Sequence, residues 1–270
     1  MFLITGATGV VGREVARLLV ERGSPVAAVT RDPRAGLPAA AHRVHPADLG
    51  TLADLDGVLI SPRAVGAGLA GLLGLAGTKR LVALSAVTVD EPAGQARFRD
   101  EFHTVEQAVR DAGPPWTILR CTDFAANSLA WAGQIRTGGV VRGAHAAART
   151  STVDERDVAA VAALALTDPG HAGSVYALTG EQSLTQADKV AAIGAATGRA
   201  LEFAEISPDD ARRGMLAAGL PGEVPDRLLG SLADYARRPG PTTDTVRRLL
   251  GRPARSFADW AADHRAAFTG

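Results

Sequence analysis

The chain has 270 residues with 29 basic and 29 acidic side chains, so its formal net charge is zero and gives no sign of a nucleic-acid-binding or membrane-binding surface. The single cysteine, Cys121, excludes an intramolecular disulfide framework and fits a reducing cytoplasm. The length allows one large domain or a core with a cap, and no apolar run is long enough to span a bilayer.

The first predicted elements flank a glycine-rich turn. Residues 2–5 form an apolar run typical of a buried strand, and apolar residues recur at helical spacing from Val11 onward. Gly6, Gly9 and Gly12 lie between these elements. In that context the first glycine permits a tight turn, the second lets backbone approach a pyrophosphate, and the third lets the helix pack on the strand. The spacing GxxGxxG matches the dinucleotide fingerprint loosely, and the alternative is a glycine-rich loop without a ligand.

The second predicted strand, residues 25–30, bears on the identity of the dinucleotide. A site for NAD is expected to place an acidic residue after this strand, to bind the ribose hydroxyls. Arg31 stands there instead, and a guanidinium suits the 2′-phosphate of NADP(H), with Arg34 as a further contributor. Asp32 keeps NAD(H) open as the less favoured cofactor. Alternatively, Arg31 and Arg34 are solvated residues of a turn and do not contact the cofactor.

The next predicted strand ends at Val44 and His45, and another spans residues 58–61. Ligands of open parallel sheets bind beyond the carboxyl ends of the strands, so the residues that follow each strand are candidate cofactor contacts. These candidates are Asp48 and Leu49 after the first strand, and Ser61 and Pro62 at the end of the second. An equally good interpretation makes Asp48 the N-cap of a short helical stretch that begins at Gly50.

Alternating strands and helices continue to about residue 180. The expected elements are strands over 80–85, 116–120 and 175–179, and helices over 97–111 and 155–166. Such alternation predicts an α/β fold with a Rossmann-type, doubly wound parallel sheet. Residues 181–270 are punctuated by proline and glycine and predict a small, mostly helical C-terminal cap on the 1–180 core, within one compact unit. Residues 125–150 are a candidate addition to that cap.

Four stretches together resemble a known family. They are "ITGATGVVG", "LVALSAVTV", "HTVEQAVRDAGPPWTILRCTDFAANSL" and "DERDVAAVAALALTDPGHAGSVYALTGEQSLTQADKV". The chain resembles the NmrA-like branch of the atypical short-chain dehydrogenases/reductases over residues 1 to about 200. That branch includes NADPH-dependent quinone and azo reductases, isoflavone-type reductases, and regulators that bind a dinucleotide without turnover. Its motifs are specific for the family and weakly specific for one activity.

The resemblance implies a set of cofactor-binding residues. The residues that match the family's phosphate loop are Gly6, Thr8, Gly9, Val10, Val11 and Gly12. Arg31 matches the residue that typically contacts the 2′-phosphate. Three later groups match segments along the riboses and the nicotinamide: Ser61 and Pro62; Ser85 and Ala86; and Cys121, Thr122, Asp123 and Phe124, with Asn127 one turn further on. The family usually has proline where Cys121 stands, which leaves that edge of the site in doubt.

The catalytic pair of typical superfamily members, Tyr-x-x-x-Lys, is absent. The chain has only Tyr176 and Tyr235, and neither is followed four residues later by lysine. The equivalent segment has Phe102 in place of the tyrosine and Glu106 in place of the lysine. Phenylalanine cannot donate a proton, and a carboxylate is a poor substitute for an ammonium group.

His103 is the best remaining candidate for an acid. An imidazole can give or take a proton near neutral pH, and Glu106 lies three residues later, where it could orient the ring. Ser85 is a further catalytic candidate, and the substrate would lie between Ser85, His103, Phe124 and the cap. The alternative is that His103 only packs or caps, while Glu106 makes a surface pair. A quinone relaxes the need for an acid, because water can protonate the stabilised hydroquinone anion.

Two further groups of residues have simpler interpretations. Asp154 is expected to cap the helix over 155–166, with Asp157 as an internal brace. Trp131, Trp260 and Phe257 are candidates for a pocket that holds a flat substrate, although aromatic residues in such positions are more often core. The six histidines show no metal-ligand spacing, and no metal is expected.

Together these patterns predict a cytoplasmic NADPH-dependent reductase that transfers hydride to a planar electrophile such as a quinone or an enone. A small molecule is the expected partner, with no nucleic acid and no membrane. Oligomeric state is open, with a homodimer as one option. Two rivals stay open: an NADP-binding redox sensor without turnover, and a natural-product tailoring reductase that acts on a ketone or an epoxide.

Overall fold

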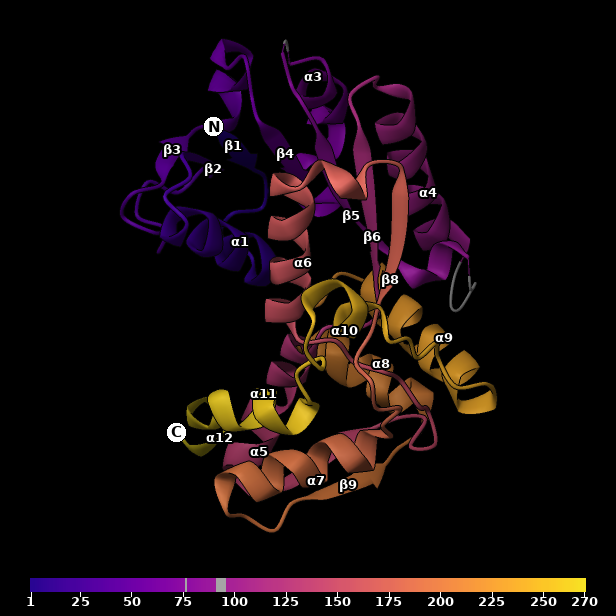
Figure 1. The fold of residues 1–270 in the computed structure, drawn as a ribbon. Coiled ribbons are helices and arrows are strands. Elements are labelled where there is room, and N and C mark those ends of the chain that lie inside the picture. The colour runs from indigo at the N-terminus through magenta and orange to yellow at the C-terminus, as the bar shows by residue number, and fades with distance from the viewer. Residues whose placement is uncertain (76, 91–95) are drawn as a thin grey trace.

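The computed structural model describes residues 1–75, 77–90 and 96–270. Seven strands form one parallel sheet with the order β3-β2-β1-β4-β5-β6-β8 (Figure 1). They are β1 (Phe2–Ile4), β2 (Val26–Val29), β3 (His42–Val44), β4 (Gly57–Ile60), β5 (Leu81–Ala86), β6 (Trp116–Cys121) and β8 (Ser174–Leu178). The strand order reverses direction between β1 and β4, which makes that position the switch point of a doubly wound sheet. The predicted Rossmann-type α/β fold is confirmed.

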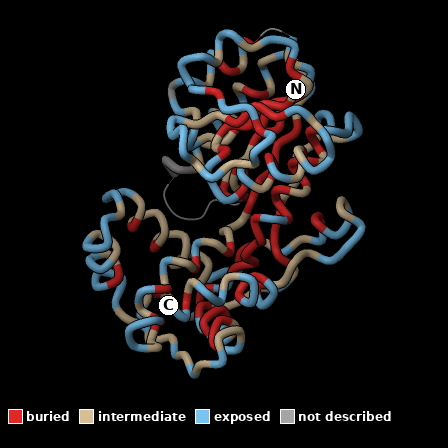
Figure 2. Tube along the Cα trace, turned by 90° about the vertical axis from the view of Figure 1, so that its left-hand side faces the viewer, coloured by how far each residue is buried: buried red, intermediate tan, exposed pale blue. Residues whose placement is uncertain are grey.

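Helices cover both faces of the sheet. One face carries α1 (Val10–Glu21), α6 (Glu155–Thr167) and α10 (Thr245–Leu250), and the other carries α2 (Pro62–Val65), α3 (Leu69–Leu73) and α4 (Ala96–Asp111). Successive strand residues point to opposite faces, so Phe2 and Ile4 pack in one core while Leu3 packs in the other. Figure 2 shows the resulting buried centre under exposed outer loops.

A third core lies at the bottom of Figure 1. It joins α5 (Ala132–Gly138) to α7 (Gln186–Thr197), α11 (Phe257–Asp263) and α12 (Arg265–Thr269). Residues between 125 and 141 therefore pack with the C-terminal helices in this core. Trp260 is fully buried there and its Nε1 donates to Glu155 Oε1 at 3.0 Å, while Phe257 stacks on it. These two aromatic residues belong to the core, and Trp131 is half-buried against it.

The C-terminal region also contains a strand that the sequence does not predict. β9 (Glu202–Glu205) pairs in parallel with β7 (Val140–Gly143). Its four residues, EFAE, are too few for a clear alternation, and their partner lies about 60 residues upstream. The remaining helices of the region are α8 (Pro208–Ala217) and α9 (Glu223–Arg237).

The start of α6 is fixed by the two predicted aspartates. The Asp154 carboxylate accepts from Arg156 N at 2.8 Å and caps the helix. Asp157 is fully buried, accepts from Arg255 N at 2.6 Å, and forms an ion pair with Arg252 at 2.7 Å. Both roles predicted from the sequence are confirmed. In the described ranges, no helix is both long and apolar enough to cross a membrane.

Candidate active site

In the turn after β1, the backbone of α1 lies close to the backbone of Gly6, just beyond the end of the strand. Gly6 has φ +63°, a conformation that favours glycine. A Cβ placed on Gly12 would overlap the Gly6 carbonyl group, at 2.7 Å from its carbon. Thr5 Oγ1 donates to Leu59 O at 2.7 Å and accepts from Ser61 N at 2.8 Å, so the turn is also tied to the end of β4. Nothing in the sequence connects positions 5 and 61, and Thr5 was missed.

The N-terminus of α1 carries no side-chain cap. Gly9 is the N-cap residue and offers no side chain to accept from the first turn. Val11 is buried in the core, whereas Val10 is 48% exposed and Thr8 is exposed beside it. Uncapped N–H groups at the positive end of a helix dipole suit an anionic phosphate.

A cavity of about 180 Å³ adjoins this turn. It is lined by Thr5, Gly6, Thr8, Val29, Thr30, Arg31, Pro46, Leu49, Ala64, Val65, Gly68 and Leu72. Apolar residues and the polar Thr5, Thr8, Thr30 and Arg31 share this lining, and the Arg31 side chain is exposed. Four predicted cofactor contacts are therefore brought together: Gly6, Thr8, Arg31 and Leu49. Ser61 and Pro62 do not line the cavity, although α2, which they begin, does.

Two acidic residues near this cavity lie outside its lining. Asp32 Oδ1 accepts from Arg34 N at 2.8 Å and stabilises the local turn. Asp48 is exposed within a short 3₁₀ helix, Pro46–Thr51. The N-cap interpretation of Asp48 is wrong, because His45 precedes the helix and its Nδ1 accepts from Ala47 N at 3.2 Å.

At the end of β5, Ser85 and Glu106 contact each other, but not in the predicted arrangement. Ser85 Oγ donates to Glu106 Oε1 at 2.6 Å. Arg120, opposite Ser85 on β6, donates to the same carboxylate from Nε at 2.8 Å and Nη2 at 2.7 Å. Burial raises the pKa of Glu106, but the hydrogen bonds from Arg120 and Ser85 and the charges of Arg120 and Arg110 outweigh it, so the net pKa is lowered. The carboxylate is 1% exposed and ionised.

The predicted orientation of His103 by Glu106 is therefore corrected. His103 is exposed on α4, and no hydrogen bond links the two side chains in the part of the chain that the structure describes. The sequence spacing allowed a contact, but the buried Arg120 competes for the carboxylate. Arg120 was missed because nothing in a strand sequence reveals its partner on a helix.

Most of the predicted cofactor contacts at the end of β6 and just after it have side chains that pack inside the protein. Cys121 is buried, and burial raises the pKa of its thiol to about 12. Thr122 Oγ1 donates to Ser151 O at 2.8 Å, and Phe124 packs against the core. Asp123 is the member of this group with a half-buried carboxylate. Asn127 is exposed.

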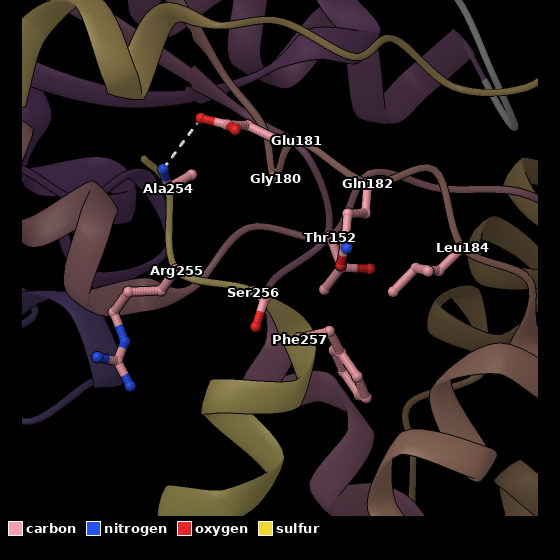
Figure 3. Close-up of a pocket in the computed structure, with 9 residues that line it drawn as sticks. All are labelled: Thr152, Gly180, Glu181, Gln182, Leu184, Ala254, Arg255, Ser256 and Phe257. Carbon is pink, nitrogen blue, oxygen red and sulfur yellow. Dashed lines mark hydrogen bonds between the residues drawn. The ribbon is translucent and has the colours of Figure 1, made fainter. Parts of the chain in front are cut away.

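A second, smaller cavity of about 110 Å³ lies between the loop after β8 and the residues before α11 (Figure 3). Thr152, Gly180 and Phe257 line it, and Glu181 accepts from Ala254 N at 3.1 Å across one side. A cavity of this size holds a few water molecules. In the described ranges, no group of three histidine, cysteine, aspartate or glutamate residues is placed to hold a metal ion.

These features fit a nicotinamide dinucleotide. The glycine turn leaves no room for a Cβ at Gly12, the start of α1 is uncapped, and Arg31 helps to line the adjoining cavity. The fold and this turn define a dinucleotide-binding protein of the Rossmann class. Residues 6–169 match the family model described as NAD(P)H-binding, and the chain belongs to that family.

Full-length relatives extend this assignment. The chain is 38% identical to the (4-alkanoyl-5-oxo-2,5-dihydrofuran-3-yl)methyl phosphate reductase of Streptomyces griseus and 33% identical to the NAD(P)H azoreductase of Xenophilus azovorans, with 99% of both chains covered in each comparison. An NADPH-dependent quinone oxidoreductase from Escherichia coli shares the fold with a TM-score of 0.80 and 26% identity, over 97% of this chain and 99% of that one. The predicted family and class, an NAD(P)H-dependent reductase, are confirmed, and the predicted cofactor is confirmed at the level of the family description.

Proposed function

We propose that this protein is an NADPH-dependent reductase of planar, conjugated electrophiles, with quinones and carbonyl-activated alkenes as its substrate class. The observation that carries the proposal is the cavity beside the glycine turn, which Arg31 lines and Asp32 does not. That arrangement favours a 2′-phosphate over a free ribose hydroxyl. The cofactor supplies the hydride when it is bound.

The residues near the end of β5 support this substrate class. Phe102 stands where typical relatives have a proton-donating tyrosine, and Glu106 is held by Arg120. A substrate whose reduced form is a delocalised anion needs little help from an acid, since water can protonate it. Quinones meet that condition, and so do alkenes conjugated to carbonyl groups.

The names of the relatives describe compounds of the same kind. The substrate named for the Streptomyces griseus reductase contains an alkene conjugated to a ring carbonyl and to an alkanoyl carbonyl. Azo compounds and quinones are also planar acceptors of two electrons. Their shared chemistry supports a planar small molecule as the partner of this chain. A cytoplasmic location and a homodimer stay predictions from the sequence.

Steady-state oxidation of NADPH, with NADH in parallel, tests the proposal against three acceptors: a soluble quinone, an acyl butenolide and an azo dye. We expect turnover of at least one acceptor and a higher kcat/KM with NADPH. Tight binding of NADP⁺ without turnover of any acceptor would instead support a redox sensor. Turnover confined to a simple ketone or an epoxide would support the tailoring reductase.

A further inference from the structure

Arg63 and Arg227 bring two guanidinium groups together from the Rossmann core and from the C-terminal region. Arg63 lies in α2, which begins directly after β4, at the edge of the sheet formed by the carboxyl ends of the strands. Arg227 lies in the second turn of α9, and Figure 1 shows α9 beneath α4, at the level where β6 and β8 end. Both arginines therefore belong to the end of the sheet where ligands of this fold bind.

The charge of Arg63 acts on Arg227. Arg227 is half-buried, whereas Arg63 is exposed. Burial lowers the pKa of Arg227 and the Arg63 charge lowers it further, while the carboxylates of Glu101 on α4 and of Glu223 act in the other direction. The net pKa of Arg227 is lowered, so the two carboxylates do not offset the burial and the Arg63 charge. Two cations in partly dehydrated surroundings repel each other, and an anion between them would relieve that cost.

The phosphates of the cofactor have other partners in the proposed function. The pyrophosphate is assigned to the glycine turn and the uncapped start of α1, and the 2′-phosphate to Arg31. Ala64 and Val65 line the cavity that Arg31 lines, but their neighbour Arg63 does not. The Arg63 side chain therefore lies outside that cavity. A further anionic group at this position would belong to the substrate.

Apolar side chains adjoin Arg227 along α9. Val224, Leu228 and Leu232 recur at every fourth position, so they share one face of the helix. All three are half-buried, and none of them packs against the four apolar cores of the described residues. Leu229, on another side of α9, belongs to the core shared with α8. An apolar face beside a cation suits a ligand that has an apolar body and a charged group.

We propose that Arg63 and Arg227 bind a phosphate ester carried by the substrate, and that the apolar face of α9 covers the rest of that molecule. The substrate class then narrows to planar, conjugated electrophiles that bear a phosphate ester. A guanidinium can donate two parallel hydrogen bonds to a phosphate, so two arginines can hold the dianion in one orientation. Such an anchor positions the conjugated carbons without touching them. The proposal rests on the proposed function, because it concerns the substrate of that reaction.

Two acyl butenolides that differ in one group test the proposal. One carries a hydroxymethyl substituent, and the other carries the phosphate ester of that alcohol. Steady-state kinetics with NADPH gives kcat and KM for each compound, and calorimetric titration of the NADP⁺-saturated protein gives each Kd without turnover.

The variants are Arg63→Gln and Arg227→Met, with Arg227→Lys as the version that keeps the charge. Arg237→Met removes an exposed charge from the last turn of α9 and is the matched control. Arg63 is exposed, so Arg63→Gln should fold even if Arg227→Met does not.

We expect the wild type to bind the ester at least about 10-fold more tightly than the alcohol. Arg63→Gln and Arg227→Met should each raise the Kd and the KM of the ester by about 10- to 100-fold, as for lost charge-assisted hydrogen bonds. The values for the alcohol and the Kd of NADP⁺ should not change. Arg227→Lys should recover part of the loss because it keeps the charge, and the control should match the wild type.

Equal affinity of the wild type for the ester and the alcohol would overturn the proposal. A loss confined to NADP⁺ in Arg63→Gln would also overturn it, and would assign Arg63 to the cofactor. In both cases turnover of the alcohol would still support the proposed function. Absence of NADPH oxidation with every acceptor would overturn that function, while the Kd values would still test the two arginines, so the two failures are distinguishable.

Discussion

Glu106 and Arg120 form a buried ion pair across the α4–β6 interface, with Nη2 and Oε2 2.7 Å apart. The arginine is 9% exposed, and its second amino group also pairs with Asp90 in the turn after β5. Ser85 completes the pair by donating to Glu106. This network fixes the end of β5, where the catalytic serine of the sequence prediction lies, and its hydroxyl hydrogen is directed toward the carboxylate.

Replacing Glu106 with Gln should destabilise the fold markedly. Among the described residues, the change leaves the buried guanidinium with the Asp90 carboxylate as its remaining countercharge. Breaking a buried pair costs about 3–5 kcal/mol. Urea unfolding followed by circular dichroism measures the loss. Asp100→Asn, which removes an exposed charge from the same helix, should cost less than about 1 kcal/mol. Equal stability of Glu106→Gln and the wild type would mean that the pair contributes nothing.

The same variant should change how stability depends on pH. The pKa of Glu106 is lower in the folded state than in the unfolded state, so its stabilisation is present above the unfolded pKa and is lost as the pH falls through the folded one. The stability difference between the wild type and Glu106→Gln should therefore shrink in acid. Unfolding curves at neutral and strongly acidic pH measure this, and a difference that grows in acid would contradict it.

Replacing Arg31 with Ala should weaken binding of NADPH selectively. Arg31 helps to line the cavity beside the glycine turn, and loss of a charged hydrogen bond to a phosphate predicts a Kd about 10- to 100-fold higher. The Kd of NADH should change little. Fluorescence titration of both cofactors measures this, with the exposed Arg22→Ala as the control. A parallel loss for NADH would assign Arg31 to the adenosine rather than to the 2′-phosphate.

Replacing Gly12 with Ala should impair both folding and cofactor binding. The new Cβ would overlap the Gly6 carbonyl, and such overpacking costs about 1–3 kcal/mol while it displaces the turn. Gly133→Ala is a matched control, because nothing lies within 4 Å of a Cβ there and α5 should gain about 0.5–1 kcal/mol. Urea unfolding and NADPH titration separate the two effects. Normal binding by Gly12→Ala would show that the turn tolerates the shift.

The parallel sheet and the glycine turn could be predicted because local patterns determine them. The apolar runs ending at Ile4 and Ile60 and the helical spacing from Val11 are properties of neighbouring residues. Positions that depend on distant pairing could not be predicted. Thr5 bonds to residues more than 50 positions away, and Lys189 reaches Asp123 across 66 positions.

The candidate proton donor illustrates the same limit. An i, i+3 spacing on α4 suggested that Glu106 could orient His103, and helical geometry allows it. The sequence could not show that Arg120 projects from β6 toward that carboxylate. A buried charge pairs with the nearest buried countercharge, which leaves the exposed imidazole without that partner.

Replacing His103 with Ala therefore tests whether the reaction needs a side-chain acid. His103 is exposed and Glu106 is engaged by Arg120, so we expect kcat with a quinone to stay within about twofold of the wild type, where a general acid would contribute about 10²–10⁴-fold. The pH profile of kcat should also be unchanged. His42→Ala on β3 is the control, because it is exposed and lies far from β5 in the strand order. A loss of 100-fold or more in His103→Ala alone would make His103 the proton donor and would require α4 to present it to the bound substrate.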